Sequence, residues 1–328
     1  MGGYVELKKA LVIADYGLNE GYGHISRVTS LLESIFFQEY EFFFVIENDE
    51  GPRFLNDKTI STLKEMPSNF TEFDTIIVDT YNVNKILKIN EDIISTKVIQ
   101  ITDNSVSPNY FIKEARKIDL EVHSPRSLDK KYIFGSLIVS RQLLNLKERR
   151  KQVKILEQDK EKKSIVVNLG GSLKTKRLLS ESIKQLAKIQ NLIVSIFCNE
   201  QMIDALKDSL NENSPNKIHF YGYGDKKLYF EKLLGADTLI CSAGGSFLEG
   251  LYLGIPIIVY DFPSNAHKNW VKFGENQYVI GRLSFSSLIE ENCLREILES
   301  KNKQRGIYPN SQVIEISVEA INDFLRVT

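Results

Sequence analysis

A histidine and an arginine stand one helical turn apart behind a glycine-rich loop. His24 directly follows Gly21, Tyr22 and Gly23 at the start of a predicted helix, and Arg27 lies three residues further along. The helix dipole disfavours additional positive charge at a helix N-terminus, so it favours a neutral imidazole there, which can accept a proton. The alternatives are a histidine that only caps or packs within the loop, and an arginine that pairs with a surface carboxylate instead of an anionic ligand.

Polar side chains follow several apolar runs that are predicted to be strands. Asp79 and Tyr81 lie in VDTY, Asp103 and Asn104 lie in ITDN, and Asn265 lies in DFPSNAHKNW after a further apolar run. Ligands of parallel sheets bind at the carboxyl ends of the strands, so these side chains are well placed for a site. The same residue types also suit turns and helix caps, and that alternative stays open for each of them.

A second glycine-rich segment, SAGGSFLEGLYLG at 242–254, lies between two apolar runs. The order predicts a strand, a tight turn, a short helix and another strand, with the amides of Gly244, Gly245 and Ser246 at the helix N-terminus. Such amides lack partners inside the helix, the dipole leaves that end partly positive, and glycine allows close approach, so the segment is suited to binding phosphate. Ser246 and Glu249 also match a capping box, which would only start the helix.

These residues are spaced along two series of alternating strands and helices. The predicted strands occupy residues 10–14, 42–46, 75–79 and 98–102 in the first half, and 164–169, 192–197, 218–221, 238–241 and 255–260 in the second. This alternation is typical of doubly wound α/β domains with parallel sheets. The charged stretch between Leu143 and Lys163 is the predicted interdomain crossing or else a solvated helix face, and the apolar spacing in 313–327 predicts a closing helix.

The composition is typical of a globular protein without a general affinity for nucleic acid. Hydrophobic residues make up 42% of the 328 residues, charged residues make up 26%, and the formal net charge is -1. No general basic surface predicts nucleic-acid binding, and no run of about 18 apolar residues predicts a membrane span, so we expect a cytoplasmic protein. The basic cluster KERRKQVK at 147–154 is expected to be a solvated face and not a membrane contact.

The cysteines show no pattern that would bind a metal or form a disulfide. Cys198, Cys241 and Cys293 are far apart, and two of them lie in apolar runs, where a buried reduced thiol is expected. No signature for a metal, a phosphate-binding P-loop or a serine nucleophile occurs, so neither a metal nor a cofactor is implied.

The motifs, taken in their order along the chain, resemble a known family. GYGHISR at 21–27, VDTY at 78–81, TDN at 102–104, NLGGS at 168–172 and SAGGSFLEGLYLGIP at 242–256 are similar to the PseG family of UDP-sugar hydrolases of pseudaminic acid synthesis. That family is related to the MurG-type glycosyltransferases and to a spore-coat polysaccharide protein. The resemblance implies the GT-B fold, in which a cleft separates two Rossmann-like doubly wound domains. We expect an N-terminal sugar- or acceptor-side domain at 1–145, a nucleotide-binding domain at 146–310 and a closing helix at 311–328.

The resemblance also implies residue roles. His24 would act as the base on an incoming nucleophile, Tyr81 would position sugar or water, and Asp79 would stand with them as the third catalytic residue. The diphosphate of a UDP-sugar would lie on the helix N-terminus within 242–254, with its ribose near Glu249. The expected substrate-binding residues are Gly21, Gly23, Arg27, Asp103, Asn104, Gly170, Gly171, Ser172, Ser242, Gly244, Gly245, Ser246, Glu249 and Asn265.

Two departures from the family pattern concern the sugar and the nucleophile. The family's aspartate-histidine-tyrosine has Thr80 in its middle position here, and its asparagine-glutamine has Ala266 in its second position. We expect an inverting nucleotide-sugar enzyme of surface-glycan biosynthesis, most simply a hydrolase that releases UDP from a UDP-linked amino-deoxy sugar. The first alternative is a glycosyltransferase that acts on a glycan or lipid-linked acceptor. The second is a non-catalytic protein that binds a nucleotide-sugar.

Overall fold

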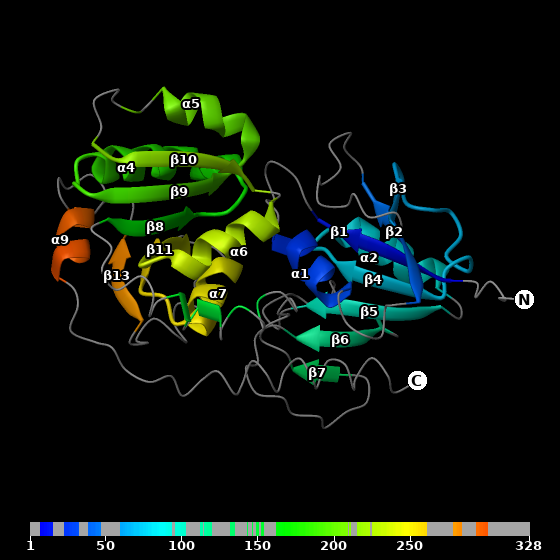
Figure 1. The fold of residues 1–328 in the computed structure, drawn as a ribbon. Coiled ribbons are helices and arrows are strands. Elements are labelled where there is room, and N and C mark those ends of the chain that lie inside the picture. Colours follow the sequence, from blue (N-terminus) through cyan, green and yellow to red (C-terminus); the bar gives the residue numbers. More distant parts are fainter. Residues whose placement is uncertain are drawn as a thin grey trace, which may run out of the picture. The chain divides into compact units, whose positions relative to one another are not determined.

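A computed structural model describes residues 7–15, 23–32, 39–46, 60–93, 96–102, 112–113, 115–119, 132–134, 143, 146, 149–150, 152–153, 162–208, 210, 215–223, 225–260, 278–283 and 293–300. The predicted closing helix at 313–327 lies outside these residues. The described residues divide into two compact units, one from each half of the chain except that Gly23 groups with the second unit (Figure 1).

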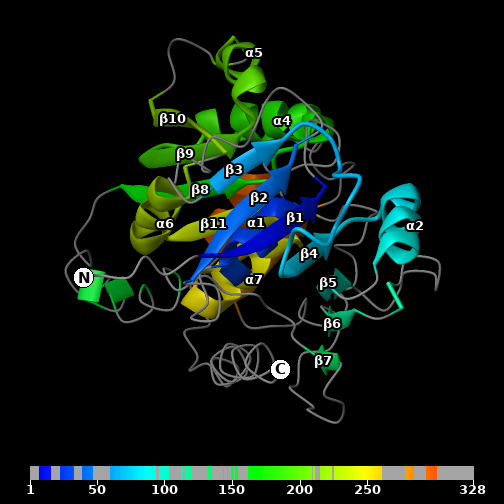
Figure 2. The same cartoon turned by 90° about the vertical axis from the view of Figure 1, so that its right-hand side faces the viewer.

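The first domain is, within the described residues, a seven-stranded parallel sheet. Its strands are β1 (Lys8–Ala14), β2 (Tyr40–Val45), β3 (Ile60–Leu63), β4 (Thr75–Asp79), β5 (Lys97–Thr102), β6 (Arg116–Asp119) and β7 (Tyr132–Phe134), in the order β3-β2-β1-β4-β5-β6-β7. The described helices are α1 (Gly23–Leu32) and α2 (Val83–Asp92). Figure 2 shows the twist of this sheet, with β3 and β7 at its two edges. β4 is buried along its whole length, as expected of a central parallel strand.

The second domain is built on a six-stranded parallel sheet. Its strands are β8 (Lys163–Asn168), β9 (Leu192–Cys198), β10 (Lys217–Gly222), β11 (Thr238–Ser242), β12 (Ile257–Tyr260) and β13 (Val279–Leu283), in the order β10-β9-β8-β11-β12-β13. Its helical segments are η4 (Leu173–Thr175), α4 (Lys176–Ala187), η5 (Glu200–Met202), α5 (Ile203–Lys207), α6 (Lys226–Gly235), α7 (Gly245–Leu253) and α9 (Cys293–Ser300). Apolar side chains of α4 and α9 share one buried cluster with β8 and β9. Figure 1 shows α6 and α7 on the other face of this sheet.

The nine predicted strands are all present, and the α/β class with parallel sheets is confirmed. The prediction was wrong at the start of β12, which begins at Ile257, because Ile255 lies in the turn that closes the end of α7. Its amide donates to the carbonyl of Gly250 at 3.0 Å, and Gly254 takes the left-handed conformation (φ 66°) that commonly ends a helix. The strands β3, β6, β7 and β13 were not predicted: β3, β6 and β13 carry polar residues among their apolar ones, and β7 is only three residues long.

The strand order reverses next to the first strand of each sheet. β1 lies between β2 and β4, and β8 lies between β9 and β11. The connections that leave the two sides of such a strand turn in opposite directions, which opens a crevice at the carboxyl ends of the strands, where doubly wound folds bind their ligands. Residues just after β1, β4, β8 and β11 are therefore the first to inspect for a site.

Arg150 departs from the expectation that KERRKQVK forms a solvated face. Its side chain is buried, with a relative exposure of 6%. Its Nη1 donates to the carbonyls of Leu233 and Leu234 at 2.8 and 2.7 Å, and its Nη2 donates to the carbonyl of Ala236 at 2.8 Å. The last carbonyls of a helix lack partners inside the helix and carry partial negative charge, so a guanidinium satisfies both needs at the end of α6. The solvated-face prediction was thus wrong at this residue.

Cys198 and Cys241 are buried free thiols, as expected from their apolar surroundings. Among the helices of the described residues, none combines the length and the apolar character that crossing a membrane would require.

Candidate functional site

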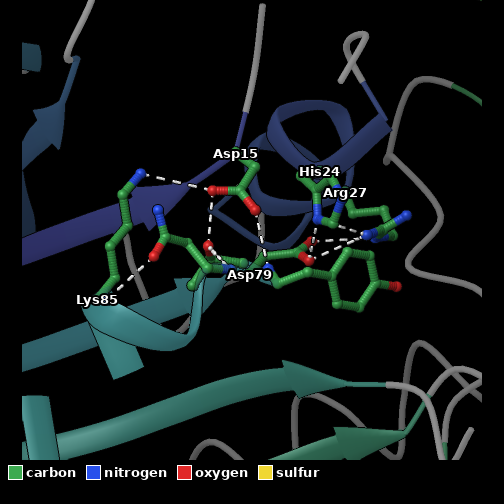
Figure 3. A network of polar contacts seen from close by, with 8 residues as sticks. Asp15, His24, Arg27, Asp79 and Lys85 are labelled. Atoms are coloured by element: carbon green, nitrogen blue, oxygen red, sulfur yellow. Dashed lines mark hydrogen bonds and ion pairs between the residues drawn. The ribbon is translucent and has the colours of Figure 1, made fainter. Parts of the chain in front are cut away.

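Three side chains of the first domain converge on the carboxyl end of β4. His24 and Arg27 lie on one face of α1, and Asp79 is the last residue of β4 (Figure 3). His24 Nδ1 lies 2.6 Å from Asp79 Oδ1, Arg27 Nε donates to Asp79 Oδ2 at 3.0 Å, and Arg27 Nη2 donates to Oδ1 at 2.9 Å. Tyr81, the third residue predicted to be catalytic, sets its ring edge-on to the imidazole, with 4.9 Å between the ring centroids.

The short contact with Asp79 determines the tautomer of His24. If Nδ1 carried a lone pair, it would face a carboxylate oxygen at 2.6 Å, and the two would repel each other. We therefore assign the proton to Nδ1, which donates to Asp79; the 2.9 Å contact between Arg27 Nη2 and Nδ1 is then not a hydrogen bond. Nε2 keeps its lone pair, and among the described residues it has no hydrogen-bond partner. A histidine held in this way has a nitrogen that can accept a proton, which is what a general base requires.

Asp79 is held as a carboxylate. Burial disfavours its charged form, but the positive charge of Arg27, the charge that His24 carries whenever its imidazole is protonated, and the hydrogen bonds from both residues outweigh burial and lower the pKa of Asp79 from 3.8 to about 2. The side chain is almost fully buried, with a residue exposure of 2%. Asp79 therefore stabilises a protonated imidazole without taking the proton itself.

A second carboxylate, which the sequence analysis did not single out, organises the turn after β4. Asp15 directly follows β1, and its amide donates to the carbonyl of Asp79 at 3.1 Å. Its Oδ1 accepts from Thr80 Oγ1 at 2.6 Å, its Oδ2 accepts from the amide of Tyr81 at 2.8 Å, and Lys85 Nζ lies 3.5 Å from Oδ1. Figure 3 shows Asp15 between Lys85 and the His24 group. Asp15 thereby fixes the backbone that presents Tyr81 to His24.

The glycine-rich segment of the second domain forms a helix start, as predicted. α7 begins at Gly245 with Gly244 as its N-cap, and no side chain caps it. The first amide that bonds within this helix belongs to Leu248, which donates to the carbonyl of Gly244 at 3.4 Å. The capping-box alternative is wrong, because Ser246 lies inside the first turn and not at the N-cap. The amides of Gly245 and Ser246 are therefore available to a phosphate.

Glu249 lies one turn into α7 and is partly exposed. Helical side chains lean toward the helix N-terminus, which in α7 is the end with the free amides. Burial raises the pKa of this carboxyl, and the ammonium group of Lys226 and the hydroxyl of Tyr229, both on α6, partly offset that rise. Ser242, the last residue of β11, lies beneath the turn; a Cβ on Gly244 would meet its Oγ at 3.6 Å.

The loop after β8 is held by hydrogen bonds between side chains and the backbone. Asn168 Oδ1 accepts from the amide of Gly170 at 3.1 Å, Asn199 Nδ2 donates to the carbonyl of Gly171 at 3.2 Å, and Ser172 caps η4 by accepting from the amide of Lys174 at 3.3 Å. Gly170 has φ +97°, which L side chains rarely adopt. Gly170, Gly171 and Ser172 thus lie at the carboxyl end of β8, the strand next to β11. The side chain of Ser172 caps η4.

Of the remaining predicted site residues, Gly23 is the exposed first residue of α1. Gly21, Asp103, Asn104 and Asn265 lie outside the described residues.

Comparison with known proteins shows similarity in structure but not in sequence. No protein-family model matches this chain, and no curated protein sequence matches it either. MurG of Acinetobacter baumannii is 15% identical, with a TM-score of 0.53 over 96% of this chain and 95% of that one. HepE of Anabaena in complex with UDP-glucose is 13% identical, with a TM-score of 0.56 over 97% and 98% of the two chains. UGT89C1 of Arabidopsis thaliana complexed with UDP-L-rhamnose is 12% identical, with a TM-score of 0.55 over 98% and 99%.

At these identities the likeness concerns the fold, and it extends over nearly the whole of both chains. Together with the two parallel sheets, it shows that this chain has the GT-B fold, with two Rossmann-like doubly wound domains.

Proposed function

We propose that this chain is an inverting nucleotide-sugar enzyme in which His24 is the general base. The observation that carries the proposal is the pair of His24 Nδ1 and Asp79 Oδ1 at 2.6 Å, which leaves Nε2 free to accept a proton. The pair lies at the carboxyl end of β4, next to β1, where the strand order reverses. The GT-B fold of solved glycosyltransferases, two of them determined with UDP-sugars, supports a nucleotide-sugar as the substrate.

The reaction that fits these groups is a single displacement. Nε2 of His24 takes a proton from an oxygen nucleophile as that oxygen forms a bond to the anomeric carbon. The bond from the anomeric carbon to the phosphate oxygen breaks, and its electron pair leaves with UDP. Attack opposite the leaving group inverts the anomeric centre. Asp79 stays ionised because its pKa is about 2, and it stabilises the imidazolium that forms.

The proposal assigns the leaving diphosphate to the start of α7. Free backbone amides and the helix dipole stabilise negative charge that grows on the leaving group, and preorganised donors of this kind are among the largest contributions to catalysis. Glu249 accepts hydrogen bonds from the ribose of the same nucleotide, as its place one turn along α7 allows.

Two nucleophiles fit the same base. Water would make the protein a hydrolase of a UDP-linked amino-deoxy sugar, which the motif resemblance to the PseG family favours. A hydroxyl of a glycan or lipid-linked acceptor would make it a glycosyltransferase, which the fold of MurG and HepE favours. We place the hydrolase first, because the motifs that match run through both domains.

The test is to incubate the protein with a panel of UDP-sugars without acceptor and to measure UDP and free sugar. Release of both in equal amounts, lost in His24→Ala, is the expected result for the hydrolase. UDP binding without release would overturn the hydrolase, and acceptor screening would then separate the transferase from a non-catalytic binding protein. Failure to bind any nucleotide-sugar would overturn the proposal as a whole.

A further inference from the structure

The guanidinium of Arg27 holds the carboxylate of Asp79 at both of its oxygens (Figure 3). Nε donates to Oδ2 at 3.0 Å, and Nη2 donates to Oδ1 at 2.9 Å. These two bonds run from one edge of the planar guanidinium to the carboxylate, an arrangement that adds geometric specificity to the attraction between the charges. Arg27 therefore determines how the carboxylate of Asp79 is oriented.

The carboxylate of Asp79 also requires a permanent positive charge beside it. Its side chain is 3% exposed, and a carboxylate buried to this degree is costly unless a cation is paired with it. A histidine that is to accept a proton must be neutral, so His24 cannot be that cation before the reaction. Arg27 is always protonated. It therefore allows Asp79 to be ionised while His24 is neutral.

One oxygen of Asp79 serves both partners. Oδ1 lies 2.9 Å from Arg27 Nη2 and 2.6 Å from His24 Nδ1. The carbonyl of Asp79 accepts from the amide of Asp15 at 3.1 Å, which fixes the backbone there. Rotation of the carboxylate about its last side-chain bond has only a weak intrinsic preference, and it would turn Oδ1 away from the imidazole. The two bonds from Arg27 oppose that rotation.

We propose that Arg27 is a positioning residue of the general base: it holds the carboxylate of Asp79 in the orientation that keeps the proton of His24 on Nδ1. The inference rests on the proposed function, in which Nε2 of His24 accepts the proton of the nucleophile. Arg27 acts on this step through Asp79, and it does not bind the anionic part of the substrate. Its replacement therefore affects the chemical step and not the binding of UDP.

The first test measures the tautomer of His24 and needs no substrate. Protein labelled with nitrogen-15 at histidine is compared with Arg27→Lys, which keeps a positive charge beside Asp79 but cannot form the two parallel bonds. Nuclear magnetic resonance at about pH 8, where free imidazole is neutral, distinguishes protonated from unprotonated ring nitrogens. The His24 signals are identified by their loss in His24→Ala. We expect one tautomer, protonated at Nδ1, in wild type and a mixture of both tautomers in Arg27→Lys.

The second test separates positioning from substrate binding. Arg27→Lys should lower kcat about tenfold, which is part of the 10² to 10⁴ that a general base contributes, and should leave UDP affinity within about twofold of wild type. In a double-mutant cycle, Arg27→Lys should change kcat little in the Asp79→Asn background, because it acts through that carboxylate.

The matched control is Arg295→Lys. This arginine of α9 is exposed, and its Nη2 donates to the carbonyl of Lys188 at 2.9 Å. The control variant should show the wild-type tautomer of His24 and the wild-type kcat. A change of tautomer in both variants would overturn a specific role of Arg27.

The outcomes separate this inference from the proposed function. A single tautomer protonated at Nδ1 in Arg27→Lys would overturn the positioning role and leave the proposed function standing. Weaker UDP binding in Arg27→Lys, with an equal loss of kcat in both backgrounds, would make Arg27 a substrate ligand instead. A wild type without a protonated Nδ1 would overturn the tautomer and the inference together. If wild type binds no nucleotide-sugar, the proposed function is overturned, and the tautomer comparison still decides whether Arg27 positions Asp79.

Discussion

Nδ1 of His24 and Oδ1 of Asp79 lie 2.6 Å apart, although the two residues are 55 positions apart in the sequence. The pair exists because α1 follows β1 in the chain and because β4 lies next to β1 in the sheet. It determines which imidazole nitrogen is free, and each prediction about the first domain depends on that assignment.

Replacing His24 should abolish most of the turnover. His24→Ala should lower kcat by about 10²-fold or more, since general bases contribute on that scale, and UDP affinity should change little. Steady-state kinetics and calorimetry measure the two effects. His219→Ala, at an exposed position of β10, is the control and should behave like wild type. Full turnover in His24→Ala would remove the proposed base.

Asp79 should make stability sensitive to acid. Its folded pKa of about 2 lies below its usual 3.8, so its contribution is fully present above about pH 4 and is lost as the pH falls through 2. The shift corresponds to roughly 2 kcal/mol in the free energy of unfolding. Urea unfolding from pH 5 to pH 2 should therefore show a steeper loss of stability in wild type than in Asp79→Asn. Parallel curves for the two proteins would contradict the ion-pair network.

Asp15 should support activity without contacting substrate. An amide in its place keeps one oxygen but cannot accept from both Thr80 and the amide of Tyr81 with equal geometry, so Asp15→Asn should loosen the turn that presents Tyr81. We expect kcat to fall about tenfold, on the scale of one charge-assisted hydrogen bond, with UDP affinity unchanged. Asp204→Asn, an exposed carboxyl on α5, is the matched control. Equal kcat in both variants would make Asp15 a purely structural residue.

A side chain on Gly245 should block the nucleotide and spare the fold. A Cβ there meets no atom within 4 Å, so Gly245→Leu should fold with nearly the wild-type melting temperature and bind UDP much more weakly. Gly250→Ala provides the contrast. Its Cβ would lie 2.6 Å from Leu239 Cδ2, so it should lower the melting temperature by overpacking. Unchanged UDP affinity in Gly245→Leu would refute the phosphate site at α7.

Local sequence patterns predicted most of the strands, because continuous apolar runs are typical of buried parallel strands. They also predicted that polar residues lie at the carboxyl ends of these strands. His24, Arg27, Asp79 and Tyr81 were each anticipated from what precedes or follows such a run. Their mutual contacts were not, since a contact between α1 and β4 depends on strand order, which no local pattern encodes. Asp15 follows the run at 10–14 as Asp79 ends the run at 75–79, and that parallel was the available signal.

The burial of Arg150 has a consequence for dissecting the chain into separate domains. This residue precedes β8, yet it supplies three hydrogen bonds to the end of α6. A fragment that begins after Arg150 would contain every described strand of the second sheet and would still leave those carbonyls without their donor. A fragment that begins at Gln142, where the second unit resumes, would keep the guanidinium. The longer fragment should therefore unfold at a higher temperature, because the last carbonyls of α6 keep their hydrogen-bond donor.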